Sequence, residues 1–134
     1  MVTVNIRGKE FPLCLTVAAV EVINGRCGSL KQLGSFLDGN DETGTADFGR
    51  MMHNTAWILG LLLQEGEENR LINARFAGQT VERRAVPGPD AMCHLLTVAG
   101  AAKYRSAVLD AVRESMVQDI EAEHPKNAEH AEQK

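Results

Sequence analysis

The stretch of residues 56–63 most constrains the fold, because it would be apolar on every side of a helix. Charge follows abruptly at Glu65, Glu67 and Glu68. A helix that is apolar all round must be buried by its own chain or by a partner. A bilayer span needs about 20 apolar residues, so this shorter stretch predicts the central helix of a small globular domain. It contains the chain's only tryptophan, Trp57, and no obvious catalytic group, which favours packing and partner binding over chemistry.

Length, charge and cysteine content fit one cytoplasmic domain. The 134 residues fall within the roughly 100–200 residues typical of a domain. The net charge of -4 makes nucleic acid a poor ligand, since that affinity rests largely on Lys and Arg. Cys14, Cys27 and Cys93 are odd in number and far apart, which indicates reduced thiols rather than a disulfide framework. The first residues lack a signal-peptide pattern, so we expect a cytoplasmic protein.

Alternation of apolar and polar residues predicts a β-hairpin at the start of the chain. The alternation covers 2–6, and a second strand returns over 10–15, with the period of two typical of half-buried strands. Gly8 suits the first central position of a type II′ turn. Thr16 then suits the N-cap of a short helix whose Val17 is expected to face inward.

Helical periodicity dominates the rest of the chain. We expect helices over about 29–37, 46–64 with a stop or kink at Gly66, 67–77, 90–96 and 97–124. Pro125 should end the last helix, and residues 125–134 are expected to be a disordered tail, because 126–134 contain no apolar residue larger than Ala. The predicted fold class is therefore mainly α. We expect a single domain over 1–124, with about five or six helices preceded by an N-terminal β-hairpin.

Motifs for catalysis or metal binding are weak. The loop 38–44 invites comparison with a calcium loop, but Thr43 and Gly49 occupy the positions where an EF-hand needs Gly and a carboxylate. Cys93 and its neighbour His94 would point about 100° apart on a helix, so they do not converge easily on one metal. A Cys–His nucleophile pair would need a distant imidazole, such as that of His53. We therefore predict no catalytic residue, no metal and no cofactor.

Three stretches carry a family resemblance. The first is 11–20 followed by 27–30. The second is the central helix 54–63 with the charged residues that follow it, and the third is 95–97 followed by 107–112. They comprise the hairpin strand passing into a Thr-capped helix, the buried helix, and the start and middle of the last helix. In this layout, which spans most of residues 4–120, the chain resembles the tail assembly chaperones of long-tailed bacteriophages and prophages.

The resemblance implies a mainly helical, non-enzymatic assembly factor of the bacterial host cytoplasm. Such proteins are thought to coat the tape measure protein and to recruit tail tube subunits. They are often made also as a longer product by ribosomal frameshifting near the end of the gene. The expected partners are therefore the tape measure and tail tube proteins, with no nucleic acid and no membrane, and a homo-oligomer is left open.

A chaperone that holds clients needs exposed apolar surface. Methionine is favoured on adaptable binding surfaces, so we place the partner-binding surface at a seam between the central and last helices. The candidate residues are Met51, Met52, Trp57, Val112, Met116 and Ile120.

Two other function classes compete with an assembly chaperone. A small helical regulator that binds nucleic acid would use Arg70, Arg75, Arg83 and Arg84 as a local basic strip, although the acidic total counts against it. An enzyme would rely on Cys93 or His53, and it would require a thiol with a depressed pKa.

Overall fold

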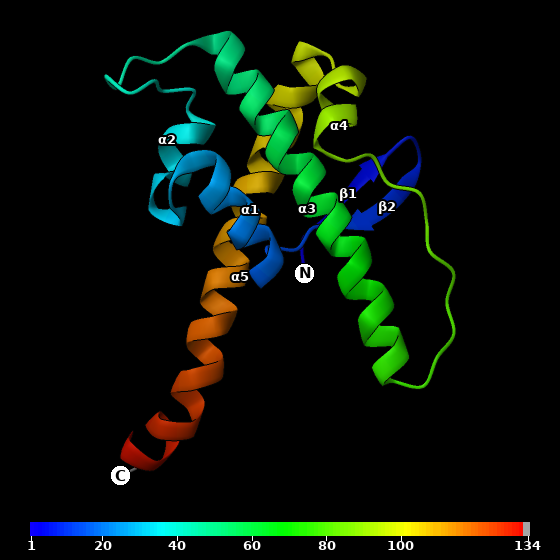
Figure 1. Cartoon of the computed structure of the whole chain (residues 1–134). Helices are drawn as coiled ribbons and strands as arrows, with labels where there is room; N and C mark the ends of the chain where they lie inside the picture. Colours follow the sequence, from blue (N-terminus) through cyan, green and yellow to red (C-terminus); the bar gives the residue numbers. More distant parts are fainter. Residues whose placement is uncertain (133–134) are drawn as a thin grey trace.

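The computed structural model describes the backbone of residues 1–132 and the side chains of residues 1–116. Strands β1 (Thr3–Ile6) and β2 (Lys9–Pro12) form an antiparallel hairpin that precedes five α-helices (Figure 1). The helices are α1 (Val17–Cys27), α2 (Leu33–Leu37) with the 3₁₀ turn η1 (Leu30–Gln32) before it, α3 (Phe48–Phe76), α4 (Pro89–Leu95) and α5 (Val98–Glu132). The predicted class, a mainly helical fold behind an N-terminal hairpin, is confirmed.

Helix α3 is the centre of the fold. Every residue from Ala56 to Leu63 except the half-buried Trp57 is buried. Neighbours on several sides make this possible, because α3 packs against α1, α2, α4, α5 and β2. Ile58, Leu59 and Leu62 are fully buried, and each such side chain contributes about 1.5–3 kcal/mol relative to an exposed one. The prediction that the apolar stretch is a buried central helix is therefore confirmed.

Helix α3 is longer than the sequence pattern indicated. It begins after the N-cap Asp47, whose carboxylate accepts the Arg50 backbone N–H at 2.8 Å. It then runs through Gly66, where the sequence predicted a stop or kink, and includes the separate helix predicted over 67–77. A Cβ atom at Gly66 would lie 2.0 Å from the Pro12 carbonyl oxygen. This glycine therefore serves the close approach of β2 to α3 and does not end the helix.

The hairpin turn differs by one residue from the predicted type II′ turn. Ile6 pairs with Lys9, so Arg7 and Gly8 are the two central residues. Both have positive φ, at 53° and 85°, which is the requirement of a type I′ turn. Gly8 therefore occupies the second central position, and Arg7 adopts the left-handed conformation that glycine would occupy more readily.

Helix α1 begins where the sequence predicted but presents a different face to the core. The Thr16 hydroxyl oxygen accepts the Ala19 backbone N–H at 3.1 Å, as an N-cap should. Ala19 and Ile23 are fully buried, whereas Val17, expected to face inward, is 80 % exposed. One turn of α1 therefore carries a large apolar side chain into solvent.

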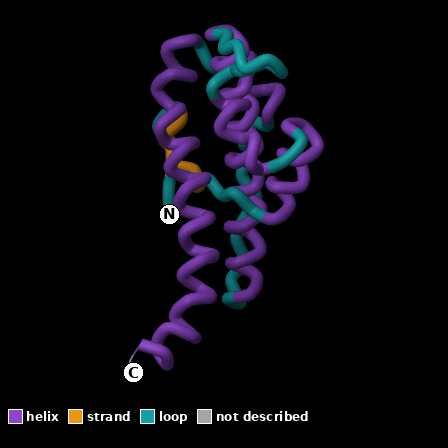
Figure 2. Tube along the Cα trace, turned by 90° about the vertical axis from the view of Figure 1, so that its left-hand side faces the viewer, coloured by secondary structure: helices purple, strands orange, loops and turns teal. Residues whose placement is uncertain are grey.

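Helix α5 packs against α3, and the two helices diverge toward their C-terminal ends (Figure 1). Seen from the side, α5 continues beyond the rest of the chain toward the C-terminus (Figure 2). It ends at Glu132, past the helix end predicted at Pro125. The side chains after Met116 lie outside the described residues, so the domain end at 124 and the disordered tail over 125–134 stay predictions. No helix in the described part of the chain is long and apolar enough to cross a membrane.

Candidate functional site

An open apolar groove lies between η1, α2, α5 and the start of α1. It consists of two hollows of about 250 and 300 Å³, which adjoin because Leu30 and Met116 line both. The remaining lining residues are Lys31, Leu33, Gly34, Leu37, Leu109 and Val112 in the first hollow, and Leu15, Thr16, Val17, Val20 and Ser115 in the second. We call this surface the α2–α5 groove.

Polar contacts at the end of α2 hold one wall of the groove in place. The Asn54 side-chain amide donates to the Phe36 carbonyl oxygen at 2.8 Å, which ties α2 to α3. The Arg105 guanidinium donates to the Leu37 carbonyl oxygen and pairs with Asp38 at 2.6 Å, which ties α2 to α5. Because these donors satisfy carbonyl oxygens at a helix end, the groove is formed before any partner arrives.

The chemistry of the α2–α5 groove suits binding rather than catalysis. Val17 is 80 % exposed and Met116 is 46 % exposed at its open side. Among the described residues, Lys31 is the only charged side chain that lines either hollow. Adjoining exposed apolar side chains of this kind mark interaction sites. The groove can therefore receive apolar side chains, and its one fixed charge is positive.

The α2–α5 groove contains part of the predicted partner-binding seam. Val112 and Met116 line it, whereas the side chain of Ile120 lies outside the described residues. Leu30 and Val17 also line the groove, and sequence reasoning did not select them. Both belong to helical segments that the sequence located, but no local pattern indicates that these segments adjoin α5.

The other three seam residues lie elsewhere on α3. Met52 is buried and Met51 is half-buried, and both lie in the first turns of the helix. Trp57 stacks edge-on against Phe36 with ring centroids 6.2 Å apart, and the Arg26 guanidinium lies 4.8 Å from the Trp57 ring. The structure therefore distributes the six candidates over more than one place, and their role in partner binding stays a prediction.

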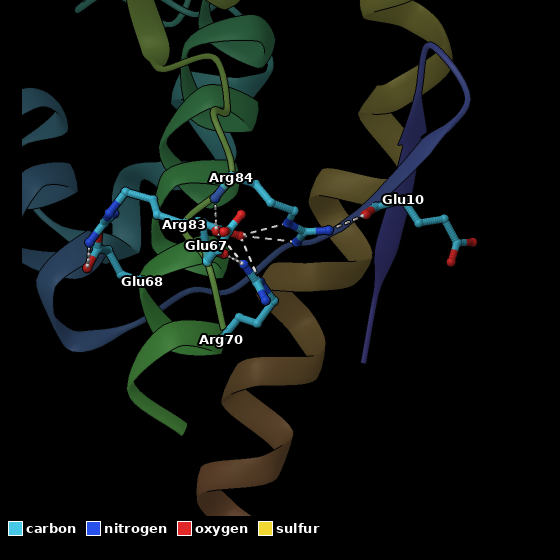
Figure 3. A network of polar contacts seen from close by, with 7 residues as sticks. Glu10, Glu67, Glu68, Arg70, Arg83 and Arg84 are labelled. Atoms are coloured by element: carbon cyan, nitrogen blue, oxygen red, sulfur yellow. Dashed lines mark hydrogen bonds and ion pairs between the residues drawn. The ribbon is translucent and has the colours of Figure 1, made fainter. Parts of the chain in front are cut away.

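A buried ion-pair network joins α3 to the segment between α3 and α4 (Figure 3). Glu67 is 2 % exposed, and its carboxylate accepts from the Arg70 guanidinium at 2.7 and 3.0 Å. It also accepts from the Arg84 backbone N–H at 2.6 Å and from Arg84 Nε at 3.1 Å. Arg84 reaches further, to the Glu10 carbonyl oxygen of β2 at 3.2 Å. Glu67 and Arg84 together thus link α3, the segment between α3 and α4, and β2.

The hydrogen bonds from Arg70, followed by those from Arg84, lower the pKa of Glu67 to about 2 although burial opposes the shift. A carboxylate that remains ionised and is saturated with donors is a poor general base. The sequence marks Glu67 only as one of three acids that follow the apolar stretch. Glu67 instead lies buried within α3, where it has a structural role.

The same network involves three of the four arginines of the alternative nucleic-acid strip. Arg70 and Arg84 pair with Glu67, and Arg83 pairs with Glu68. Phosphate binding depends on cations that can exchange counterions for phosphates. Arginines already paired with carboxylates offer less free positive charge to phosphates than the sequence alone indicated. The network therefore gives the nucleic-acid hypothesis no support.

The cysteine thiols do not have the environment of activated nucleophiles. Burial raises the pKa of Cys14, Cys27 and Cys93, which favours the protonated form. The Cys93 thiol donates to the backbone carbonyl oxygen of His53 at 3.7 Å, while the His53 imidazole Nε2 faces Arg26 Nη2 at 3.4 Å. An activated thiol needs a lowered pKa, so these contacts give the enzyme hypothesis no support.

The network around Glu67 predicts a specific dependence of stability on pH. The pKa of the Glu67 carboxyl falls from 4.5 to about 2 on folding. Its contribution to the free energy of unfolding is therefore present above pH 4.5 and is lost as the pH falls toward 2. With 1.36 kcal/mol per pKa unit, the loss between pH 6 and pH 3 is about 2 kcal/mol. Urea unfolding at both pH values measures it, and Glu67→Gln should reduce the difference between them by that amount. An unchanged difference in the variant would contradict this role of Glu67.

The loop between α2 and α3 uses its central acid internally. The Asp41 carboxylate accepts from the Thr43 hydroxyl at 2.7 Å and from the Thr43 and Thr45 backbone N–H groups, both at 2.9 Å. In the part of the chain that the structure describes, no group of three or more His, Cys, Asp or Glu residues is placed to hold a metal ion.

No family model, curated protein or solved structure matches the chain.

Proposed function

We propose that this protein is a non-enzymatic tail assembly chaperone of a phage or prophage, acting in the host cytoplasm on tape measure and tail tube proteins. The observation that carries the proposal is the α2–α5 groove, a preformed apolar surface with Val17 and Met116 open to solvent. A protein that holds clients needs such a surface. The resemblance in layout supplies the identity of the clients.

The groove also fits the way in which holding proteins bind. Its lining is mostly Leu, Val and Met, and unbranched methionine adapts to different partner side chains. Lys31, the single charged residue of the lining, can orient a client by pairing with an acidic group. One such contact does not restrict binding to one client sequence. We therefore assign the main contact with clients to the groove.

Substitution in the groove should reduce client capture. Met116→Asp places a charge on a 46 % exposed apolar position, and we expect at least a tenfold loss of tape measure or tube protein captured after coexpression from the same locus. Ile72→Asp is the matched control, because Ile72 is 47 % exposed on α3 and is not a lining residue of the groove. Circular dichroism should show both variants folded. Equal capture by Met116→Asp and Ile72→Asp would refute the groove as the client site.

Val17→Asp provides a second variant, since Val17 lines the other hollow and is 80 % exposed. Met52→Asp, which the predicted seam would favour as a test, is less informative because Met52 is buried and an unpaired charge there would unfold the protein. The DNA near the stop codon gives an independent test of the family. A slippery run with an overlapping downstream frame supports it, and a clean intergenic gap opposes it.

A further inference from the structure

We propose that a second hollow, on the opposite side of α2 from the α2–α5 groove, binds a segment of a protein partner that carries both acidic and basic side chains, with Arg26 as its anchor. The inference goes beyond the proposed function, because it concerns a different surface and holds whichever protein occupies the groove. It rests on the contacts of Arg26, on the fixed walls of the hollow and on the separation of charge between those walls.

The hollow has a volume of about 690 Å³ and lies between the end of α1, the η1–α2 segment and the loop that joins α2 to α3. Figure 1 shows this loop on the same side of α3 as α1 and α2. Ser35 and Phe36 of α2 line the hollow, whereas Leu33, Gly34 and Leu37 line the α2–α5 groove. These two sets of residues point to opposite faces of the helix. We call the second surface the α1–α2 hollow.

The first observation is that Arg26 is held in place without a carboxylate partner. Its guanidinium carbon lies 4.8 Å from the centre of the Trp57 ring and 6.0 Å from that of Phe36, and its Nη2 lies 3.4 Å from His53 Nε2. Among the residues whose side chains the structure describes, no acid pairs with this guanidinium. A guanidinium over an aromatic face keeps its in-plane N–H groups available, and carboxylates are their preferred acceptors. Arg26 is therefore a positioned donor for a carboxylate of another molecule.

The second observation is that the loop wall of the hollow is fixed. The Asn40 side-chain amide donates to the Ser35 hydroxyl at 3.0 Å, which ties the loop to α2. Arg50 Nε donates to the Gly39 carbonyl oxygen at 2.9 Å, which ties the loop to α3. The hydrogen bonds that Asp41 accepts within the loop close it on itself. Binding therefore does not have to order this loop, which removes one of the usual entropic costs of association.

The third observation is that the two walls carry opposite charges. Arg26 is the only cation among the described lining residues and lies on the α1 wall, whereas Asp41 and Glu42 lie on the loop wall. A uniformly negative ligand, such as a nucleic acid or free phosphate, would be attracted by one wall and repelled by the other. A protein segment with an acidic and a basic side chain is attracted by both, and such complementarity determines specificity at interfaces.

Each wall then has a defined part in recognition. We expect Arg26 to pair with the acidic side chain of the partner and Glu42 to pair with the basic one. Asp41 contributes its charge but not a direct contact, because its carboxylate already accepts three hydrogen bonds within the loop. Trp57 acts through Arg26, whose guanidinium it positions.

Trp57 also allows the site to be tested, because the chain's only tryptophan lies beside Arg26. The full chain is titrated at low salt with a short acetylated peptide of alternating glutamate and lysine. We expect a saturable change in tryptophan fluorescence with a dissociation constant below about 1 mM. The same peptide with glutamine in place of glutamate should bind at least tenfold more weakly, because it offers no carboxylate to Arg26.

Three variants assign the binding to the hollow. Arg26→Gln should weaken binding of the alternating peptide at least tenfold, measured also by calorimetry because the substitution itself changes the surroundings of Trp57. Arg75→Gln is the matched control, since Arg75 is an equally exposed class of arginine in the last turn of α3 and is not a lining residue. Glu42→Lys should reverse the preference, so that an all-glutamate peptide binds more tightly than the alternating one. Circular dichroism should show all three variants folded.

Absence of a saturable response to the alternating peptide up to about 1 mM would overturn the site, as would unchanged affinity in Arg26→Gln. Tighter binding of a short single-stranded oligonucleotide or of inorganic phosphate than of the peptide would overturn the assignment to a protein partner. Client capture separates this inference from the proposed function. Capture that depends on Met116 without peptide binding refutes only the α1–α2 hollow, and peptide binding with capture unaffected by Met116→Asp refutes only the role of the groove.

Discussion

Replacing Glu67 with alanine is expected to reduce the free energy of unfolding by about 3 kcal/mol, the lower end of the usual cost of removing one partner of a buried ion pair, because the arginine partners are 28 % and 37 % exposed. The carboxylate is 2 % exposed and accepts from Arg70 and from both the side chain and the backbone N–H of Arg84. Without it, two guanidinium groups lose their counter-charge and a backbone donor loses its acceptor. Urea unfolding followed by circular dichroism measures the change.

The neighbouring acid provides the control. Glu68 pairs with Arg83, but their side chains are 43 % and 58 % exposed, and exposed pairs contribute roughly 0–1 kcal/mol. Glu68→Ala should therefore cost much less stability than Glu67→Ala. If the two alanine variants lose similar stability, the network around Glu67 is not the junction that the structure indicates.

Loss of the Glu67 carboxylate should also release the segment between α3 and α4. The Arg84 backbone N–H donates to that carboxylate at 2.6 Å, and the Arg70 guanidinium donates to the Glu82 carbonyl oxygen at 2.7 Å. The segment 79–88 has no helix or strand, so these contacts position it. We therefore expect faster amide hydrogen exchange at Arg84 in Glu67→Ala than in Glu68→Ala.

The parts of the fold that sequence reasoning predicted well are those determined by local patterns. The alternation before and after Gly8, the capping hydroxyl of Thr16 and the stretch of 56–63 that is apolar all round each specify an element without knowledge of its neighbours. Local patterns reveal periodicity and caps because these depend on residues only a few positions apart. The hairpin, the first helix and the buried central helix were predicted on that basis.

The features that were missed depend on contacts between distant residues. Glu67 meets Arg84, which is 17 positions away, and nothing in the local sequence distinguishes this glutamate from Glu65 or Glu68. The groove requires Leu30 and Met116 to adjoin, although they are 86 positions apart in the sequence. A single sequence does not contain this information, since many topologies are compatible with the same helix order. The predicted seam therefore selected Val112 and Met116 but paired them with residues of α3 that lie elsewhere.

Substitution of Gly66, where the sequence predicted a stop or kink of the central helix, is expected to have the second large effect on stability. Gly66→Ala is expected to cost about 3 kcal/mol, near the upper end for overpacking. The added Cβ would lie 2.0 Å from the Pro12 carbonyl oxygen, a backbone atom that no rotation of a side chain can remove. Either β2 or α3 must shift, and the backbone hydrogen bond from Cys14 N–H to the Leu62 carbonyl oxygen, 3.3 Å long, should weaken with it.

Gly25→Ala separates this steric effect from the intrinsic cost of glycine in a helix. Gly25 lies within α1, and a Cβ there meets nothing within 4 Å, so alanine should stabilise the protein by up to about 1 kcal/mol. Glycine-to-alanine substitution is thus expected to destabilise the protein at Gly66 and to stabilise it at Gly25. The reason is that, of these two glycines, only Gly66 lies against the backbone of a strand. Urea unfolding of both variants decides the matter. A stabilising Gly66→Ala would mean that β2 does not pack against α3 at this residue, and Cys14 amide exchange as slow as in the wild type would agree with that result.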